Sequence, residues 1–337
     1  MQQRPLGPSG IPASVVGLGT WAIGGWMWGG TEESQSIRAI HAAIDAGVTL
    51  IDTAPIYGFG VSESIVGKAI RDRRERVVLA TKCSMVCDPT RGQFKFRSTA
   101  LGHDPRGHVV IHIHSSRQSI RQEIEDSLAR LQTDRIDLYQ THWQDPTTPI
   151  EETMRALVEL KREGKIRAIG VCNASVADME QYRKAGTLDS DQEKYSMLAR
   201  SIEREQLPYC RHWGMAVLAY SPLALGLLTG KIGPQRQFNP GDLRRDHPQF
   251  SVENRQRVAE MLQKMRPIAE AHGVTLGQLV IAWTFHQPGL THVLCGARDP
   301  AQALENAAAG DVRLSAEEVQ AIRALVEQYA PATAPAT

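Results

Sequence analysis

The sequence predicts a (β/α)8 TIM barrel, an α/β fold, with an N-terminal β-hairpin and an extra C-terminal helix. Short β-branched runs alternate with amphipathic helical patterns along the whole chain, and such alternation predicts a parallel sheet. No linker or change of composition divides the 337 residues, which favours one closed barrel over two doubly wound domains. With 42% hydrophobic residues, the chain can bury a large core.

The barrel is expected to span residues 1–329 as a single domain, starting with a proline- and glycine-rich hairpin at 2–13. The strands are expected at 14–18, 48–52, 77–81, 136–139, 166–171, 190–193, 215–219 and 291–294. Helices are expected at 33–46, 120–131, 150–162, 175–185, 203–211, 275–286 and 300–309. Ser315 and Glu318 have the spacing of a capping box for the terminal helix. Residues 330–337 are rich in Pro, Ala and Thr, and we expect a disordered tail there.

Two connections are unusually long, at about 83–114 and about 223–253. Both follow predicted strands, so they lie at the face of the barrel where active sites of this fold are built. Long connections without secondary structure are uncommon unless they serve a function. We therefore expect both to flank a site, and the first to cover one side of a pocket.

Charge balance and cysteine content exclude several classes of protein. The chain has 38 Lys and Arg against 37 Asp and Glu, and this balance argues against binding to nucleic acid or to a membrane surface. No apolar run is long enough for a transmembrane helix, and the N-terminus lacks the apolar stretch of a signal peptide. Five scattered cysteines argue against a disulfide scaffold and for a reducing cytoplasm. No feature predicts the oligomeric state.

Four ionisable residues follow predicted strands at the active face. Asp52 ends one strand, Tyr57 lies in the loop beyond it, Lys82 ends the next strand, and His142 follows a later one. A free phenol has a pKa of about 10, which is poorly matched to acid catalysis near neutral pH. We expect a close ammonium from Lys82 to lower that pKa, and Asp52 to keep the ammonium charged. His142 could orient a substrate oxygen or relay a proton. Such a set suits protonation of an oxygen that gains negative charge, as in carbonyl reduction.

The segment Asp52-Thr53-Ala54-Pro55-Ile56-Tyr57-Gly58-Phe59-Gly60-Val61-Ser62-Glu63 resembles the signature of the aldo-keto reductase family. Thr81-Lys82 and the segments 137–143, 164–173 and 220–224 resemble it too, in the same order, so the likeness runs from about residue 3 to 328. The resemblance implies reversible, NADPH-dependent reduction of an aldehyde or ketone to an alcohol. It makes Tyr57 the proton donor, Lys82 and Asp52 its tuning pair, and His142 the residue that orients the substrate.

The resemblance also implies the cofactor contacts. Cys172, Asn173 and Gln192 would hold the nicotinamide amide, Tyr220 would stack on its ring, and Thr20 and Trp21 would lie nearby. Cys172 stands where the family usually has serine, and a thiol is a weaker hydrogen-bond donor. Asp52 would also contact the cofactor. The segment 221–231 resembles the family's pyrophosphate strap, with contacts implied for Ser221, Pro222, Leu223, Ala224, Gly226 and Lys231. The segment 296–306 resembles the end that binds the adenosine, with contacts implied for Gly296, Arg298, Gln302, Glu305 and Asn306.

The adenosine end also suggests which cofactor is used. The segment 296–306 ends the last strand and opens a helix, whose N-terminus is a natural phosphate site. Arg298 can bind a 2′-phosphate through two parallel hydrogen bonds. We therefore favour NADP(H) over NAD(H), with Glu305 and Asn306 facing the adenine.

Two other functions compete with this interpretation. His112-Ile113-His114, near His103 and His108, resembles the metal-binding H-x-H of amidohydrolase-type barrels. That motif belongs on the first strand, however, and here it falls in the connection after the third, where surface histidines on a loop are expected. Cys83 and Cys87 lack a second pair for zinc, so no metal site is expected. Potassium channel β subunits share the family's fold and act as partner-bound sensors, but we expect no inactivating segment at this N-terminus, which argues against that role.

A small carbonyl compound is the expected substrate, and its identity is not predicted. Aromatic side chains could form the walls of its pocket, namely Trp21, Trp26, Trp28, Phe59 and Trp143.

Overall fold

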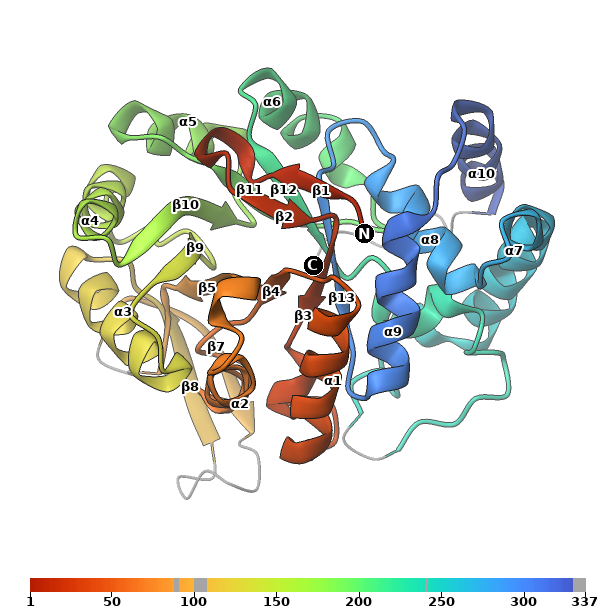
Figure 1. Ribbon diagram of the computed structural model, residues 1–337, viewed down its shortest axis with the longest axis horizontal. Helices are drawn as coiled ribbons and strands as arrows, with labels where there is room; N and C mark the ends of the chain where they lie inside the picture. The colour runs from red at the N-terminus through yellow and green to blue at the C-terminus, as the bar shows by residue number, and fades with distance from the viewer. Residues whose placement is uncertain (88–90, 100–107, 240–241, 330–337) are drawn as a thin grey trace.

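The computed structural model describes residues 1–87, 91–99, 108–239 and 242–329. Parallel strands close into a barrel in the order β10-β11-β12-β13-β3-β4-β5-β9 (Figure 1). They are β3 (Val16–Gly19), β4 (Leu50–Asp52), β5 (Val78–Cys83), β9 (Ile136–Thr141), β10 (Ile166–Cys172), β11 (Ser190–Lys194), β12 (Ala216–Tyr220) and β13 (His292–Gly296). The ladder that places Val293 of β13 opposite Val16 of β3 closes the ring. The predicted barrel is therefore confirmed.

Helices surround the barrel. They are α1 (Glu33–Asp45), α2 (Val61–Ile70), α3 (Arg117–Leu131), α4 (Ile150–Arg162), α5 (Val176–Ala185), α6 (Gln206–His212), α7 (Val252–Ala271), α8 (Leu276–Phe285), α9 (Pro300–Ala308) and α10 (Ala316–Tyr329). The predicted capping box before α10 is formed, since the Glu318 amide donates to Ser315 Oγ and the Ser315 amide donates to the Glu318 carboxylate. Helices α2 and α7 were not predicted from the sequence.

The N-terminal hairpin closes one end of the barrel. Its strands β1 (Gln3–Pro5) and β2 (Pro12–Ser14) pair antiparallel, as expected for residues 2–13. Leu6 and Ile11 pack inside the barrel against Leu50, Leu138 and Leu218, all of them buried. Because apolar side chains fill this end, the polar strand ends at the opposite face are left to form a site.

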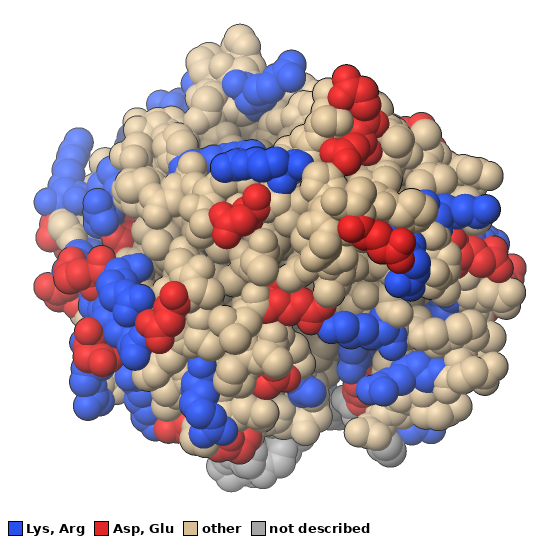
Figure 2. All heavy atoms as spheres, turned by 45° about the vertical axis from the view of Figure 1, so that its right-hand side comes forward, with Lys and Arg blue, Asp and Glu red and all other residues tan. Residues whose placement is uncertain are grey.

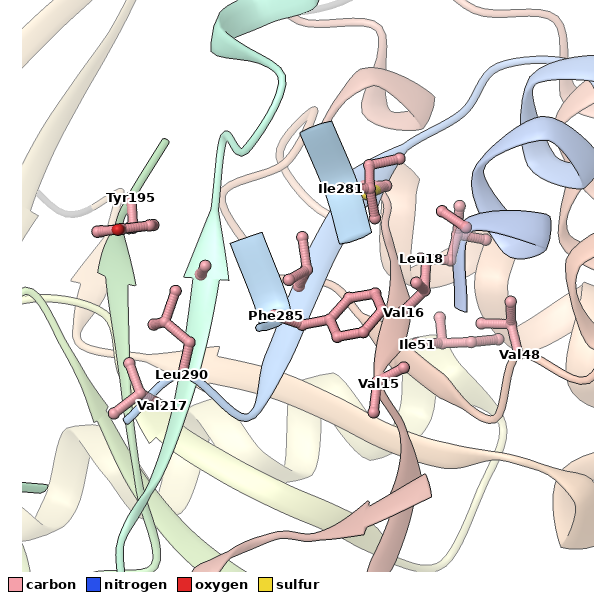
Figure 3. Close-up of a cluster of buried hydrophobic side chains, with 14 of the residues drawn as sticks. Val15, Val16, Leu18, Val48, Ile51, Tyr195, Val217, Ile281, Phe285 and Leu290 are labelled. Carbon is pink, nitrogen blue, oxygen red and sulfur yellow. The ribbon is translucent and has the colours of Figure 1, made fainter. Parts of the chain in front are cut away.

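A larger apolar core lies between the strands and the helices. Figure 3 shows Phe285 of α8 pointing toward Val16 of β3, and Ile281 of α8 and Leu18 of β3 belong to the same buried cluster. Fully burying a side chain of this size stabilises the fold by about 1.5–3 kcal/mol, so this layer holds the strand ends in register.

The first long connection forms a small antiparallel sheet, whereas we expected a loop. β6 (Met85–Val86), β8 (His108–Ile113) and β7 (Gln93–Thr99) pair in that order. Val109 and Ile111 of β8 are buried in a cluster with Trp26 and Ile56, which fixes this sheet against the barrel. The alternation of Val109, Ile111 and Ile113 is the period-two signal that could have predicted β8.

On the face seen in Figure 2, acidic and basic side chains are interspersed, in keeping with the net charge of +1. No helix in the described part of the chain combines the length and hydropathy that a membrane crossing requires. The predicted tail at 330–337 and His103 lie outside the described residues.

Candidate active site

Asp52, Tyr57, Lys82 and His142 meet at the carboxyl ends of neighbouring strands. Asp52 is the last residue of β4, Lys82 lies in β5, and His142 follows β9, the next strand in the barrel. Lys82 Nζ donates to Asp52 Oδ2 at 2.7 Å and to Tyr57 Oη at 3.2 Å. The Tyr57 and His142 rings meet edge to face, with 5.9 Å between centroids. The structure therefore brings these four predicted residues together.

Burial and pairing set the charges of this cluster. Burial opposes the charge of Lys82, but Asp52 and Tyr57 outweigh it and hold the pKa of this ammonium above its usual value. Burial raises the pKa of Tyr57 to about 12, and the Lys82 ammonium offsets only part of that rise. Our expectation of a lowered phenol pKa is therefore wrong, because desolvation of a phenolate outweighs the nearby cation.

His142 is neutral near neutral pH. Burial, followed by the positive charges of Lys82 and Lys95, lowers the pKa of His142 well below its usual value. Its Nδ1 atom has no hydrogen-bond partner among the described residues. A neutral imidazole can donate one hydrogen bond, so His142 can orient an oxygen without adding a charge to the site.

Two amides hold the second carboxylate oxygen of Asp52. Gln192 Nε2 donates to Asp52 Oδ1 at 2.9 Å, and Gln140 Nε2 approaches the same oxygen at 3.4 Å. Gln192 was predicted to hold the cofactor amide, and here it also fixes the aspartate. Gln140 was missed, although it lies on β9 directly opposite Lys82 of β5 in the ladder between these strands.

Asn173 connects two walls of the site. Its Nδ2 donates to the His142 carbonyl at 3.0 Å, and its Oδ1 accepts from the Tyr220 hydroxyl at 2.8 Å. The residue has a φ of 54°, in the left-handed region that asparagine tolerates better than most side chains. Asn173, directly after β10, thus ties the His142 segment to Tyr220.

A cavity of about 780 Å³ opens beside Asp52, Tyr57 and His142. Most of the predicted cofactor and substrate residues line it, namely Thr20, Trp21, Trp26, Trp28, Trp143, Asn173, Gln192, Tyr220, Ser221, Pro222, Leu223, Gly226, Lys231, Gly296, Arg298, Gln302, Glu305 and Asn306.

Four predicted site residues do not line this cavity. Lys82 is fully buried and donates hydrogen bonds to Tyr57 and Asp52, which do line it. Phe59 packs against Trp26, with 5.3 Å between ring centroids, and so supports the wall instead of forming it. Cys172 and Ala224 are buried, and the expected contact of the Cys172 thiol with the cofactor has no support in this geometry.

Both long connections add lining residues that the sequence analysis missed. Met85 and Phe96 come from the small antiparallel sheet, and Arg236 and Arg244 come from the connection before α7. Arg244 Nη2 is paired with Asp242 at 2.6 Å, and its guanidinium lies 5.5 Å from the Trp28 ring. The prediction that these connections flank the site agrees with the structure.

Lys231 and Arg298 lie at one end of the cavity, which we call the cationic end, and both already bind other groups of this chain. Lys231 Nζ lies 2.6 Å from Glu305 Oε2, and Arg298 Nη1 donates to the Trp28 carbonyl at 2.9 Å. The Asp299 carboxylate caps α9, accepting from the Gln302 amide at 2.8 Å. This acidic cap makes the N-terminus of α9 a weaker anion site than expected, so the guanidinium and ammonium groups supply most of the positive potential.

The donor set fits a nicotinamide dinucleotide. Asp52, Tyr57, Lys82 and His142 are called the tetrad below. Near it, Tyr220 offers an aromatic face and Asn173 and Gln192 offer amides, as a flat ring with a carboxamide requires. Further along, Lys231 and Arg298 offer cations to phosphates. An apolar ligand would leave these polar groups unused.

Comparison with known proteins decides the family. A profile described as "Aldo/keto reductase family" matches residues 15–327. The chain belongs to this family. An aldo-keto reductase is an oxidoreductase that reduces carbonyl compounds with a nicotinamide cofactor, so the predicted carbonyl reduction with such a cofactor is confirmed.

Three relatives illustrate the match. The reductase is 42% identical over 333 residues to the NADH-specific methylglyoxal reductase of Escherichia coli, covering 97% of this chain and 99% of that protein. The glycerol dehydrogenase AKR11B4 of Gluconobacter oxydans superposes with a TM-score of 0.85 at 37% identity, covering 98% and 96% of the two chains. An aldo-keto reductase of Klebsiella pneumoniae, solved with NADPH, gives a TM-score of 0.72 at 29% identity and covers 100% and 98%.

The histidine-rich segment does not form the rival site. His108 and His112 lie on β8, and His112 is buried, not at the surface as expected for a loop. Within the described residues, no cluster of three or more His, Cys, Asp and Glu side chains has the geometry to hold a metal ion. The comparisons do not favour the amidohydrolase or channel-subunit alternatives either.

Proposed function

We propose that this enzyme reduces small aldehydes or ketones with NADPH, and that Tyr57 supplies the proton. The observation that carries this proposal is the Lys82 ammonium, which hydrogen-bonds to both the Asp52 carboxylate and the Tyr57 hydroxyl beside the cavity. Burial keeps the Tyr57 phenol protonated at neutral pH, and the ammonium lies where the phenolate would form.

The roles of the side chains follow from this geometry. The nicotinamide supplies a hydride when it is bound. Tyr57 donates its proton to the carbonyl oxygen as that oxygen gains charge, and Lys82 stabilises the phenolate that remains. Asp52, held by Gln192 and Gln140, keeps the ammonium in position. The neutral His142 donates a hydrogen bond that orients the carbonyl oxygen.

For the cofactor, we propose a preference for NADPH over NADH. Arg298 is the candidate for a 2′-phosphate, and Arg236 and Arg244, which also line the cavity, add positive charge. Asn173, Gln192, Tyr220, Thr20 and Trp21 would surround the nicotinamide. The strap from Ser221 to Lys231 would hold the pyrophosphate, and Gly296, Gln302, Glu305 and Asn306 the adenosine. The name of the Escherichia coli relative points to NADH instead, so this preference needs a direct test.

For the substrate, we propose a small carbonyl compound bound between Trp21, Trp26, Trp28 and Trp143. Relatives named for methylglyoxal reduction and glycerol oxidation support this size class. The scattered cysteines noted in the sequence support a reducing cytoplasm as the compartment.

The test is the substitution Tyr57→Phe, which removes one hydroxyl and keeps the ring. We expect kcat/KM for aldehyde reduction to fall about 10²- to 10⁴-fold because the general acid is lost. NADPH affinity, measured by fluorescence titration, should change little.

Tyr209→Phe is the matched control, since this half-buried tyrosine of α6 lies away from the cavity. Near-normal turnover by Tyr57→Phe, with correct folding shown by circular dichroism, would contradict the proposed proton donor.

A further inference from the structure

Lys95 occupies an irregular position on the small sheet beside the active site. In the β7–β8 ladder, Phe94 pairs with His112 and Phe96 pairs with Ile111, so Lys95 is the extra residue of a β-bulge. Bulges are enriched beside active sites, where they redirect a side chain. Lys95 itself does not line the cavity, but the next residue, Phe96, does, and the Lys95 ammonium lies against the cavity-lining Trp143, so Lys95 lies at the rim of the site.

The Lys95 ammonium rests on one wall of the site. Its Nζ atom lies 3.5 Å from the centroid of the Trp143 ring, and Trp143 lines the cavity directly after His142. The positive charge also contributes, after burial and Lys82, to the lowered pKa of His142. The field of Lys95 therefore extends to the residue proposed to orient the carbonyl.

No carboxylate in the described part of the chain lies within ion-pair distance of Lys95. The other charges at this end are balanced, because Lys82 is paired with Asp52 and His142 is neutral. Lys95 is thus a cation at the rim of the site that packs against the aromatic face of Trp143. Such a cation attracts an anionic group on an incoming ligand.

We infer that Lys95 is a specificity-determining residue that favours carbonyl substrates bearing a carboxylate. This inference rests on the proposed function of the site. A single ammonium suits a carboxylate, whereas phosphate groups are generally held by several donors. Because Lys95 lies at the rim and Tyr57 lies deeper, the carbonyl and the carboxylate should be separated by a short chain.

Succinic semialdehyde and pentanal form a matched pair of substrates, since both are aldehydes of similar length and one carries a terminal carboxylate. For the unaltered enzyme we expect a higher kcat/KM for succinic semialdehyde, and this preference should weaken as ionic strength rises. The Lys95→Met variant should lower the ratio of the two kcat/KM values about tenfold, an effect between those of exposed and buried ion pairs.

The change should appear mainly in KM, because the ion pair forms equally in the ground and transition states. Lys95→Arg should retain most of the preference, and Lys95→Glu should reverse it. Lys184→Met, at an exposed position of α5, is the control for loss of a lysine. Thermal unfolding of each variant shows whether the fold is intact.

The outcomes separate this inference from the proposed function. An equal change for both substrates in Lys95→Met would mean that Lys95 only packs against Trp143, and it would overturn the inference. Reduction of pentanal without preference for succinic semialdehyde would also overturn it, while leaving the proposed function in place. Failure of the unaltered enzyme to reduce either aldehyde would overturn both.

Discussion

The two ends of the cavity are built differently. At the tetrad end, Lys82 and Asp52 are almost fully buried, and their hydrogen bonds are complete in the protein alone. At the cationic end, the Lys231 side chain is 64% exposed and is paired with Glu305, while the exposed Arg298 donates to a backbone carbonyl.

This difference suits the tetrad end to the chemical step and the cationic end to cofactor binding. A buried, fully hydrogen-bonded cluster needs no rearrangement when charge develops in the transition state. Exposed cations that hold internal partners must exchange those partners for phosphate oxygens when a dinucleotide binds. Substitutions at the tetrad end should therefore act on kcat, and those at the cationic end on affinity.

The largest effect is expected from Lys82→Met. Loss of the ammonium removes the cation that stabilises the phenolate, so kcat/KM should fall about 10³-fold. Removing one partner of a buried ion pair also leaves the other uncompensated, at a cost of about 3–5 kcal/mol, so thermal unfolding should move to lower temperature.

Lys231→Met makes the same change at the other end and is the control for Lys82→Met. Steady-state reduction and NADPH titration should show a few-fold loss of affinity in the control, with kcat largely kept. Equal losses of kcat in the two variants would remove the distinction between the ends.

The intermediate effect is expected from Arg298→Ala. A charge-assisted hydrogen bond to a 2′-phosphate is worth about 1.5–3 kcal/mol, so NADPH affinity should fall about tenfold or more. NADH lacks that phosphate, and its affinity should change little. Competitive fluorescence titration with both cofactors measures the two values side by side. Parallel weakening of NADPH and NADH would show that Arg298 does not read the phosphate.

The barrel and the tetrad could be predicted because their signals are local in the sequence. Most barrel strands are short apolar runs, with the polar β11 (Ser190–Lys194) as an exception, and Asp52 and His142 stand at the ends of such runs. Closure of the barrel then brings the strand ends together. Helix α7 was not predicted, although the expected connection ends at about residue 253 and Val258, Met261, Leu262 and Met265 follow at helical spacing.

Other features depend on three-dimensional placement and had no local signal. The pKa of Tyr57 depends on how deeply the phenol is buried, and burial outweighs the ammonium that the sequence did reveal. Lys95 reaches Trp143 only because a β-bulge shifts the register of its strand. The pairing of Lys231 with Glu305 joins residues 74 positions apart, and no spacing rule links them.

That last pair supports the smallest prediction. In Glu305→Gln, Lys231 loses its carboxylate partner, so the ammonium becomes available to a phosphate without breaking an ion pair. Exposed ion pairs contribute little, so we expect NADPH to bind only about two- to threefold more tightly. The gain should shrink as ionic strength rises, because exposed charges are screened.

The double variant Glu305→Gln with Lys231→Met separates this effect from a direct role of Glu305 at the adenine. If the gain in NADPH affinity disappears in the double variant, the Lys231 ammonium is its source. The ion pair between Lys231 and Glu305 then weakens NADPH binding in the unaltered enzyme. A loss of affinity in Glu305→Gln alone would instead assign Glu305 to cofactor contact. In that case Arg298 would be the residue at this end that exchanges a partner within the protein for phosphate oxygens when the cofactor binds.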